Sequence, residues 1–267
     1  MHNKRWITGL IAVPFLIFFI QKGGIWLFML VAVAAELGLW EYYRIMLDGD
    51  ERMASGLPVI GFFSVVLILF AAYRNAPDLV SVALAFNMLA SALFAILRFG
   101  SVPHILKPLT KQLLGVGYIP FFLSFLLLIR NSTEGIIWVY FLLAIVFAGD
   151  ISALYVGSAI GRHKLSPSVS PGKTIEGSLG GLAANLVVGC LIKLFFLPTL
   201  PWPQTLLSCL VIGVAGQVGD LFESVLKRSS QVKDSGGLLP GHGGILDRID
   251  ALLFAAPIAY LFKIHIF

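Results

Sequence analysis

Apolar runs of about 20 residues recur along almost the whole chain, and they limit the fold more than any other feature. A helix needs about that length to cross roughly 30 Å of hydrocarbon. Nine such runs can be delimited approximately, at 6–21, 25–47, 53–73, 79–97, 113–129, 136–161, 179–197, 205–228 and 249–267. The sequence therefore predicts an all-α polytopic integral membrane protein with about nine transmembrane helices.

The composition agrees with a membrane environment, since 58% of the residues are hydrophobic and only 12% are charged. No polar connection is long enough to hold a soluble domain, so residues 1–267 are expected to form a single transmembrane domain. Most polar groups suited to chemistry lie late in the chain. We therefore expect residues 1–135 to be N-terminal helices of scaffold type and residues 136–267 to be the catalytic half.

Lysine and arginine residues predict the orientation of these helices. With the N-terminus in the cytoplasm, 14 of them lie on the inner side and five on the outer side. Cytoplasmic loops of membrane proteins carry such an excess. The net charge of +5 then follows mainly from topology, and no nucleic-acid partner is predicted.

Acidic residues inside apolar runs are harder to explain by topology. Asp220 and Glu223 lie in the eighth run, and each charge at bilayer depth costs about 2.5 to 3.5 kcal/mol. Asp220, Ser224 and Lys227 share one helical face, while Glu223 precedes Lys227 by four residues and can pair with it. The spacing predicts a polar cavity at the cytoplasmic end of this helix, although Glu223 and Lys227 could form only a helix-end salt bridge.

Small residues in the seventh and eighth runs have a simpler interpretation. Glycine and alanine at helical spacing let neighbouring membrane helices approach closely. We expect such packing at Gly177, Gly180, Gly181, Ala184, Gly213, Ala215, Gly216 and Gly219.

A glycine-rich loop follows the eighth run and suits a bound phosphate. Its glycines allow tight turns whose amide groups converge on an anion. These glycines are Gly236, Gly237, Gly241, Gly243 and Gly244, and the charged or donor side chains nearby are Lys227, Arg228, Lys233, His242 and Arg248.

Two carboxylates, Asp247 and Asp250, open the ninth run at positions i and i+3. One interpretation is helix capping, with Asp247 at the N-cap and Asp250 at N3. The other is a divalent cation that bridges the protein and a polyphosphate, because paired carboxylates beside a phosphate loop supply suitable ligands.

A second polar segment, at 161–178, lies on the same predicted side. Its Pro-Gly-Lys-Thr resembles the end of a phosphate-binding P-loop, but Pro167 stands where that motif needs glycine, and no strand is predicted before it. The P-loop interpretation therefore fails. The remaining alternatives are a phosphate-holding loop and a merely solvated basic loop, with Glu176 as a cap of the next helix. The groups that could hold phosphate are Arg162, Lys164, Ser168, Ser170, Lys173 and Thr174.

The order of residues between 224 and 250 resembles the signature of the phosphatidate cytidylyltransferases, also called CDP-diacylglycerol synthases. The matching positions are Ser224, Lys227, Arg228, Lys233, Asp234, Gly236, Leu239, Pro240, His242, Gly243, Gly244, Asp247, Arg248 and Asp250. The segments 149–157 and 170–177 resemble shorter motifs of the same family. The resemblance covers roughly the C-terminal half of the chain.

This resemblance implies that CTP and phosphatidic acid react to give CDP-diacylglycerol and pyrophosphate with Mg²⁺, a second cation being an option. It implies metal ligation by Asp220, Asp247 and Asp250, and phosphate neutralisation by Lys227, Arg228, Lys233, His242 and Arg248. Substrate contacts are expected from Asp150, Ser170, Lys173, Thr174, Ser224, Gly243 and Gly244. The implied location is a bacterial inner membrane, among membrane lipids, with a cytoplasmic active site; a homodimer is an assembly that the resemblance allows.

Two other functions fit the same architecture. A CTP-dependent polyprenol or dolichol kinase would transfer the γ-phosphate and release CDP. A cation-coupled transporter would use the intramembrane acids to bind its ion. The transporter is disfavoured because the polar residues gather on one side, and no internal repeat is found.

Overall fold

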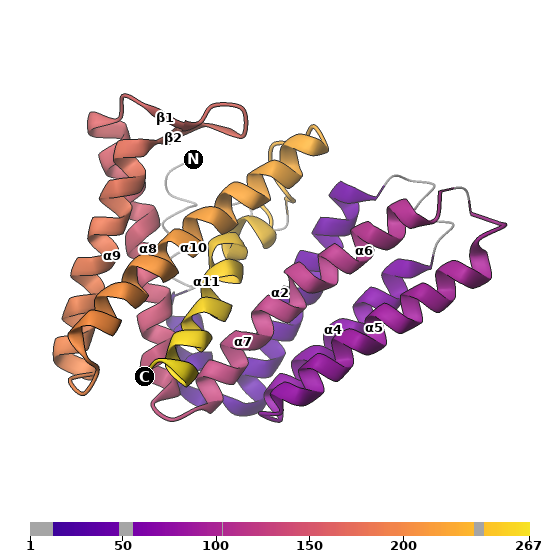
Figure 1. The fold of residues 1–267 in the computed structure, drawn as a ribbon, viewed down its shortest axis with the longest axis horizontal. Coiled ribbons are helices and arrows are strands. Elements are labelled where there is room, and N and C mark those ends of the chain that lie inside the picture. The colour runs from indigo at the N-terminus through magenta and orange to yellow at the C-terminus, as the bar shows by residue number, and fades with distance from the viewer. Residues whose placement is uncertain (1–12, 48–55, 103, 238–242) are drawn as a thin grey trace. The chain divides into compact units, whose positions relative to one another are not determined.

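A computed structural model describes residues 13–47, 56–102, 104–237 and 243–267 (Figure 1). The chain divides into two compact units. The first contains Met1–Asn131 and Ser229–Arg248, and the second contains Ser132–Arg228 and Ile249–Phe267. The described part of residues 229–248, called the signature loop below, therefore packs with the N-terminal helices. The predicted division at residue 135 remains a prediction, because it concerns catalytic roles as well as packing.

The first unit is built around α4, Leu57–Tyr73, which packs against α2, α5, α6 and α7 (Figure 1). The bounds of those helices are Gly24–Met46 for α2, Pro77–Arg98 for α5, Leu106–Tyr118 for α6 and Pro120–Asn131 for α7. Pro120 separates α6 from α7 because proline has no N–H to donate to the preceding turn. The predicted run 113–129 therefore extends over parts of two helices, α6 and α7.

A buried polar network joins α4, α5 and α6 within this unit. The side-chain oxygen of Asn87 accepts hydrogen bonds from the Ser64 hydroxyl at 2.9 Å and from the Gln112 amide at 2.8 Å. The Ser91 hydroxyl donates to the side-chain oxygen of Gln112 at 3.1 Å. Hydrogen bonds of this kind hold helices together where apolar burial discriminates poorly between protein and lipid.

The second unit contains α8, Gly135–Ile160, and α9, Ile175–Phe196, which pack side by side (Figure 1). It also contains most of α10, Trp202–Ser229, and of α11, Leu246–His265. A Cβ atom at Gly177 would lie 2.6 Å from the carbonyl oxygen of Ala153 on α8, and one at Gly213 would collide with the Asn185 side chain on α9. The predicted close packing is thus confirmed at Gly177 and Gly213.

A two-stranded antiparallel hairpin lies between α8 and α9 and corrects the expectation of a purely helical chain. Strand β1, Lys164–Ser166, pairs with β2, Ser170–Thr174, over a turn at 167–169. An isolated hairpin of this size is marginal in water. This one packs against α9 and α8, which accounts for order in a segment expected to be an irregular loop.

Six helical segments in the described part of the chain are long and apolar enough to cross a membrane. They are Gly24–Met46, Pro77–Arg98, Leu106–Asn131, Gly135–Ile160, Ile175–Phe196 and Trp202–Ser229. The helices Val13–Lys22 and Leu57–Tyr73 are apolar but shorter, and α11 carries four charged side chains among its 20 residues. A polytopic, predominantly helical membrane protein is therefore supported, while the count of nine spans is not confirmed.

Candidate active site

The second unit brings Lys173 and Asp220 together. Lys173 lies on β2 and Asp220 on α10, and the lysine Nζ is 2.5 Å from the aspartate Oδ2. Their side chains remain 28% and 32% exposed, so both groups can also meet solvent or a ligand. The polar segment 161–178 is thus joined to α10 by an ion pair.

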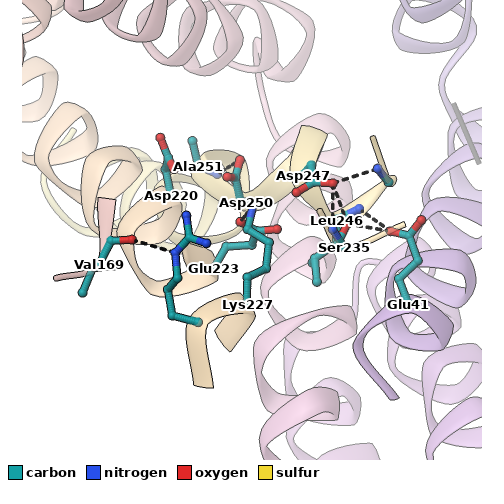
Figure 2. A network of polar contacts seen from close by, with 12 residues as sticks. Glu41, Val169, Asp220, Glu223, Lys227, Ser235, Leu246, Asp247, Asp250 and Ala251 are labelled. Carbon is teal, nitrogen blue, oxygen red and sulfur yellow. Dashed lines mark hydrogen bonds and ion pairs between the residues drawn. The ribbon is translucent and has the colours of Figure 1, made fainter. Parts of the chain in front are cut away.

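Asp250 adds a second helix, α11, to this group. A Cβ atom at Gly219 would lie 2.5 Å from the carbonyl oxygen of Asp250, so the glycine beside Asp220 allows α11 to approach α10 closely. Asp250 interacts electrostatically with Asp220, Asp150 and Lys227, and its Oδ1 accepts a hydrogen bond from the Ala251 N–H at 2.7 Å (Figure 2). Carboxylates from α8, α10 and α11 therefore act on one another in this part of the unit.

Glu223 and Lys227 form the ion pair that their spacing predicted (Figure 2). The Glu223 side chain is almost fully buried, and Lys227 is 16% exposed. Ser224 lies beside them, half-buried on α10. A buried carboxylate next to a less buried lysine holds the ammonium group in place, because separating the two would leave an uncompensated charge.

The hairpin residues have structural contacts of their own. Thr174 is the N-cap of α9, and its hydroxyl accepts a hydrogen bond from the Gly177 N–H at 3.1 Å. The Glu176 carboxylate, which was expected to cap the helix, accepts hydrogen bonds from the backbone N–H groups of Arg162 and His163. The Arg228 Nε donates to the Val169 carbonyl at 3.3 Å (Figure 2).

A cavity of about 290 Å³ lies between this hairpin and the helices α8 and α9. Its lining includes the predicted substrate-binding residues Ser170, Lys173 and Thr174, together with apolar side chains such as Leu154 and Leu165. The cavity is large enough for several heavy atoms of a ligand and offers both a cation and an apolar wall.

Asp247 belongs to the first unit and organises the loop before α11. Its Oδ2 accepts hydrogen bonds from the Ser235 N–H at 3.1 Å, the Ser235 hydroxyl at 2.8 Å and the Gly244 N–H at 2.8 Å (Figure 2). Since α11 begins at Leu246, Asp247 lies inside its first turn rather than at the N-cap. Gly243 has a φ of 79°, a conformation that favours glycine, and a Cβ there would lie 2.7 Å from the same aspartate oxygen.

The remaining predicted site residues stay predictions. Lys233 and Arg248 are exposed in the first unit, and Arg248 lies in the first turn of α11. His242 lies outside the described residues. Among the described residues, no group of three or more His, Cys, Asp and Glu side chains is arranged to hold a metal ion, and the metal assignment of Asp220, Asp247 and Asp250 remains a prediction.

Glu41 and Ser235 were not identified from the sequence, although both are completely buried and contact the loop that carries Asp247. Glu41 stands in an apolar run beside two tyrosines, with Arg44 three residues further along the chain, so its sequence context allowed a local pair with that arginine and did not single it out. Its partners lie late in the chain, and only the structure identifies them.

The helices and the mixed acidic and basic clusters define a polytopic membrane protein equipped to hold anionic groups. Residues 3–266 match the model of the cytidylyltransferase family, and the chain belongs to this family. It is 32% identical over 266 residues to the phosphatidate cytidylyltransferase of Bacillus subtilis (strain 168), and the aligned residues cover 97% of this chain and 96% of that protein. Its identity to the phosphatidate cytidylyltransferase of Staphylococcus haemolyticus (strain JCSC1435) is 32% over 270 residues, 98% of each chain.

Proposed function

We propose that this chain transfers the cytidylyl group of CTP to phosphatidic acid, giving CDP-diacylglycerol and pyrophosphate. The observation that carries the proposal is the nearly full-length similarity to phosphatidate cytidylyltransferases, joined to an unbroken signature between residues 224 and 250. The helical membrane architecture supports it, because a lipid substrate can stay in the bilayer while CTP approaches from water.

The reaction needs charge neutralisation more than a strong base. An oxygen of the phosphatidic acid phosphate attacks the α-phosphorus of CTP, and the bond between that phosphorus and the oxygen leading to the β-phosphorus breaks. Pyrophosphate leaves with the electron pair. Both reactants are anions, so positioning and electrostatic stabilisation dominate, as in other phosphoryl transfers.

The second unit supplies the cations for this task. Lys173 and Lys227 each pair with a carboxylate, Asp220 and Glu223 respectively, which fixes the direction of each ammonium group. We assign both lysines to neutralising phosphate oxygens, with Arg228 beside the hairpin. Ser170 and Thr174 line the neighbouring cavity, where a substrate would contact them. Lys233, His242 and Arg248 keep their proposed role with the lipid phosphate and the departing pyrophosphate.

The donor chemistry of the second unit also fits Mg²⁺. The Asp250 carboxylate interacts electrostatically with those of Asp220 and Asp150, and hard oxygen donors that repel one another suit a divalent cation. We propose Asp220 and Asp250 as the ligands, because Mg²⁺ binds through one or two carboxylates and keeps phosphate oxygens and water for its other positions. When bound, the ion would lower the negative charge on the triphosphate. The metal role of Asp247 and a second cation remain predictions.

The proposed side of the membrane for the active site follows from the charge distribution. We propose a cytoplasmic N-terminus, with the polar cavity and active site at the cytoplasmic side of a bacterial inner membrane, since 14 of 19 lysine and arginine residues lie on that side of the predicted topology. A homodimer remains a prediction. Identifying pyrophosphate rather than CDP as the coproduct separates this function from a CTP-dependent polyprenol kinase.

A further inference from the structure

Glu41 is a completely buried acid near the C-terminal end of α2. Its Oε2 accepts a hydrogen bond from the backbone N–H of Leu246, the first residue of α11, at 2.9 Å. The same oxygen lies 3.2 Å from the Ser235 hydroxyl (Figure 2). A buried carboxylate is tolerated when donors satisfy it. Here, both contacts fall on Oε2 and come from the two ends of the loop between α10 and α11, whereas Oε1 has no hydrogen-bond partner in the described part of the chain.

Two glycines of the signature loop are shaped to this carboxylate. A Cβ atom at Gly236 would collide with Oε1 of Glu41, and one at Gly244 would collide with Oε2 and with the Ser235 hydroxyl. The sequence suggested that these glycines free the backbone to approach an anion. The anion that they approach in the structure is the side chain of Glu41.

Ser235 links Glu41 to Asp247. A hydroxyl has one proton to donate, and the Ser235 oxygen is closer to Asp247 Oδ2, at 2.8 Å, than to Glu41 Oε2, at 3.2 Å. The proton therefore goes mainly to Asp247, while the Leu246 N–H holds Glu41. Arg44, one turn further along α2, donates to the Ser235 carbonyl at 3.0 Å and fixes the same residue from its other side.

We infer that Glu41 is a positioning residue for the transferase reaction, acting through Ser235 on Asp247 and on the first turn of α11. The inference rests on the proposed function and on the predicted site roles of Asp247 and Arg248. Glu41 does not touch the substrates. It fixes the rotamer of a site carboxylate and the start of the helix that carries it, and this gives α2 a part in catalysis beyond a scaffold.

The experiment compares purified Glu41→Ala, Glu41→Gln, Ser235→Ala and the Glu41→Ala/Ser235→Ala double variant for kcat/KM with CTP and phosphatidic acid. Only protein that elutes as a folded species is assayed. Glu41→Ala leaves the Leu246 N–H without its acceptor and removes the side chain that lies against the Ser235 hydroxyl, and a loss of kcat/KM of about 10- to 100-fold is expected. Glu41→Gln keeps an oxygen acceptor of the same reach and is expected to stay within about threefold of the unmodified protein.

The double variant tests whether Glu41 acts through Ser235. If Glu41 acts through Ser235, adding Ser235→Ala to Glu41→Ala costs less than about threefold more, whereas independent roles would multiply the two losses. Glu36→Gln is the matched control, because Glu36 lies on the same helix and has no recorded hydrogen bond to the described part of 229–248. Its activity is expected to be unchanged.

The inference is overturned if folded Glu41→Ala keeps full kcat/KM, if Glu41→Gln loses as much as Glu41→Ala, or if the double variant shows multiplied losses. Should Glu41→Ala not fold, Ser235→Ala decides, since it removes only a hydroxyl: full activity then overturns the inference, and a tenfold loss of the order expected for a lost hydrogen bond supports it. An unmodified protein that makes no CDP-diacylglycerol would instead refute the proposed function.

Discussion

Replacing Asp220 by asparagine tests whether its carboxylate takes part in catalysis or only stabilises the structure. The substitution keeps the shape of the side chain and removes the charge that pairs with Lys173 at 2.5 Å and interacts with Asp250. If the ion pair only held the hairpin to α10, its loss would have a small effect on both stability and activity. If Asp220 takes part in the reaction, activity would fall far more than stability.

The exposure of the two side chains sets the expected loss of stability. The two side chains are 28% and 32% exposed, so solvent screens the pair, and such pairs contribute about 1 kcal/mol or less. For a chain of this size, that corresponds to a decrease in Tm of about 2 to 4 °C. The loss of a charge that acts in the transition state is expected to lower kcat by at least about 100-fold, equivalent to about 2.7 kcal/mol.

The assay measures CTP-dependent CDP-diacylglycerol and pyrophosphate formation by purified protein in detergent, alongside thermal unfolding of the same samples. Asp78→Asn is the matched control, because it makes the same chemical change at an exposed position in the first turn of α5. Folded Asp220→Asn with more than about half of the original kcat would refute the catalytic role. A fall in Tm above about 10 °C would refute the argument that the pair is weakly stabilising.

Three further predictions follow from the packing and from the proposed cation. Asn87→Ala removes the acceptor shared by Ser64 and Gln112 and should lower the free energy of unfolding by about 1 to 2 kcal/mol in detergent denaturation, so an unchanged midpoint would contradict the network's role. Gly219→Val should reduce activity by at least about tenfold, since its Cβ would meet the Asp250 carbonyl oxygen at 2.5 Å. The control is Gly117→Ala, whose Cβ would meet no atom within 4 Å, and equal activities of the two variants would argue against the close approach of α10 and α11. Chelation by EDTA should abolish product formation and added Mg²⁺ should restore it, whereas full activity in EDTA would exclude the divalent cation.

The sequence was informative wherever the physical cause was local. Runs of apolar residues indicated membrane helices, and the spacing of Glu223 and Lys227 predicted their ion pair, because residues four apart lie on one helical face. Glycines at helical spacing likewise predicted close helix contacts, which Gly177 and Gly213 show.

Long-range partners were beyond the sequence. The pairing of Lys173 with Asp220 joins a hairpin to a distant helix, and short strands without a strong alternating pattern gave no sign of that hairpin. The contact of Glu41 with Ser235 joins residues far apart in the chain. The closeness of Gly236 and Gly244 to a carboxylate from α2 was likewise beyond the sequence, and their phosphate-binding role stays a prediction.

The most direct test of the proposed function uses the unmodified protein. Purified protein is incubated with CTP, Mg²⁺ and phosphatidic acid, and the nucleotide and phosphate products are identified. Pyrophosphate and CDP-diacylglycerol are expected in equal amounts, and their formation is expected to depend on the lipid. Release of CDP with a phosphorylated lipid, or no consumption of CTP, would contradict it.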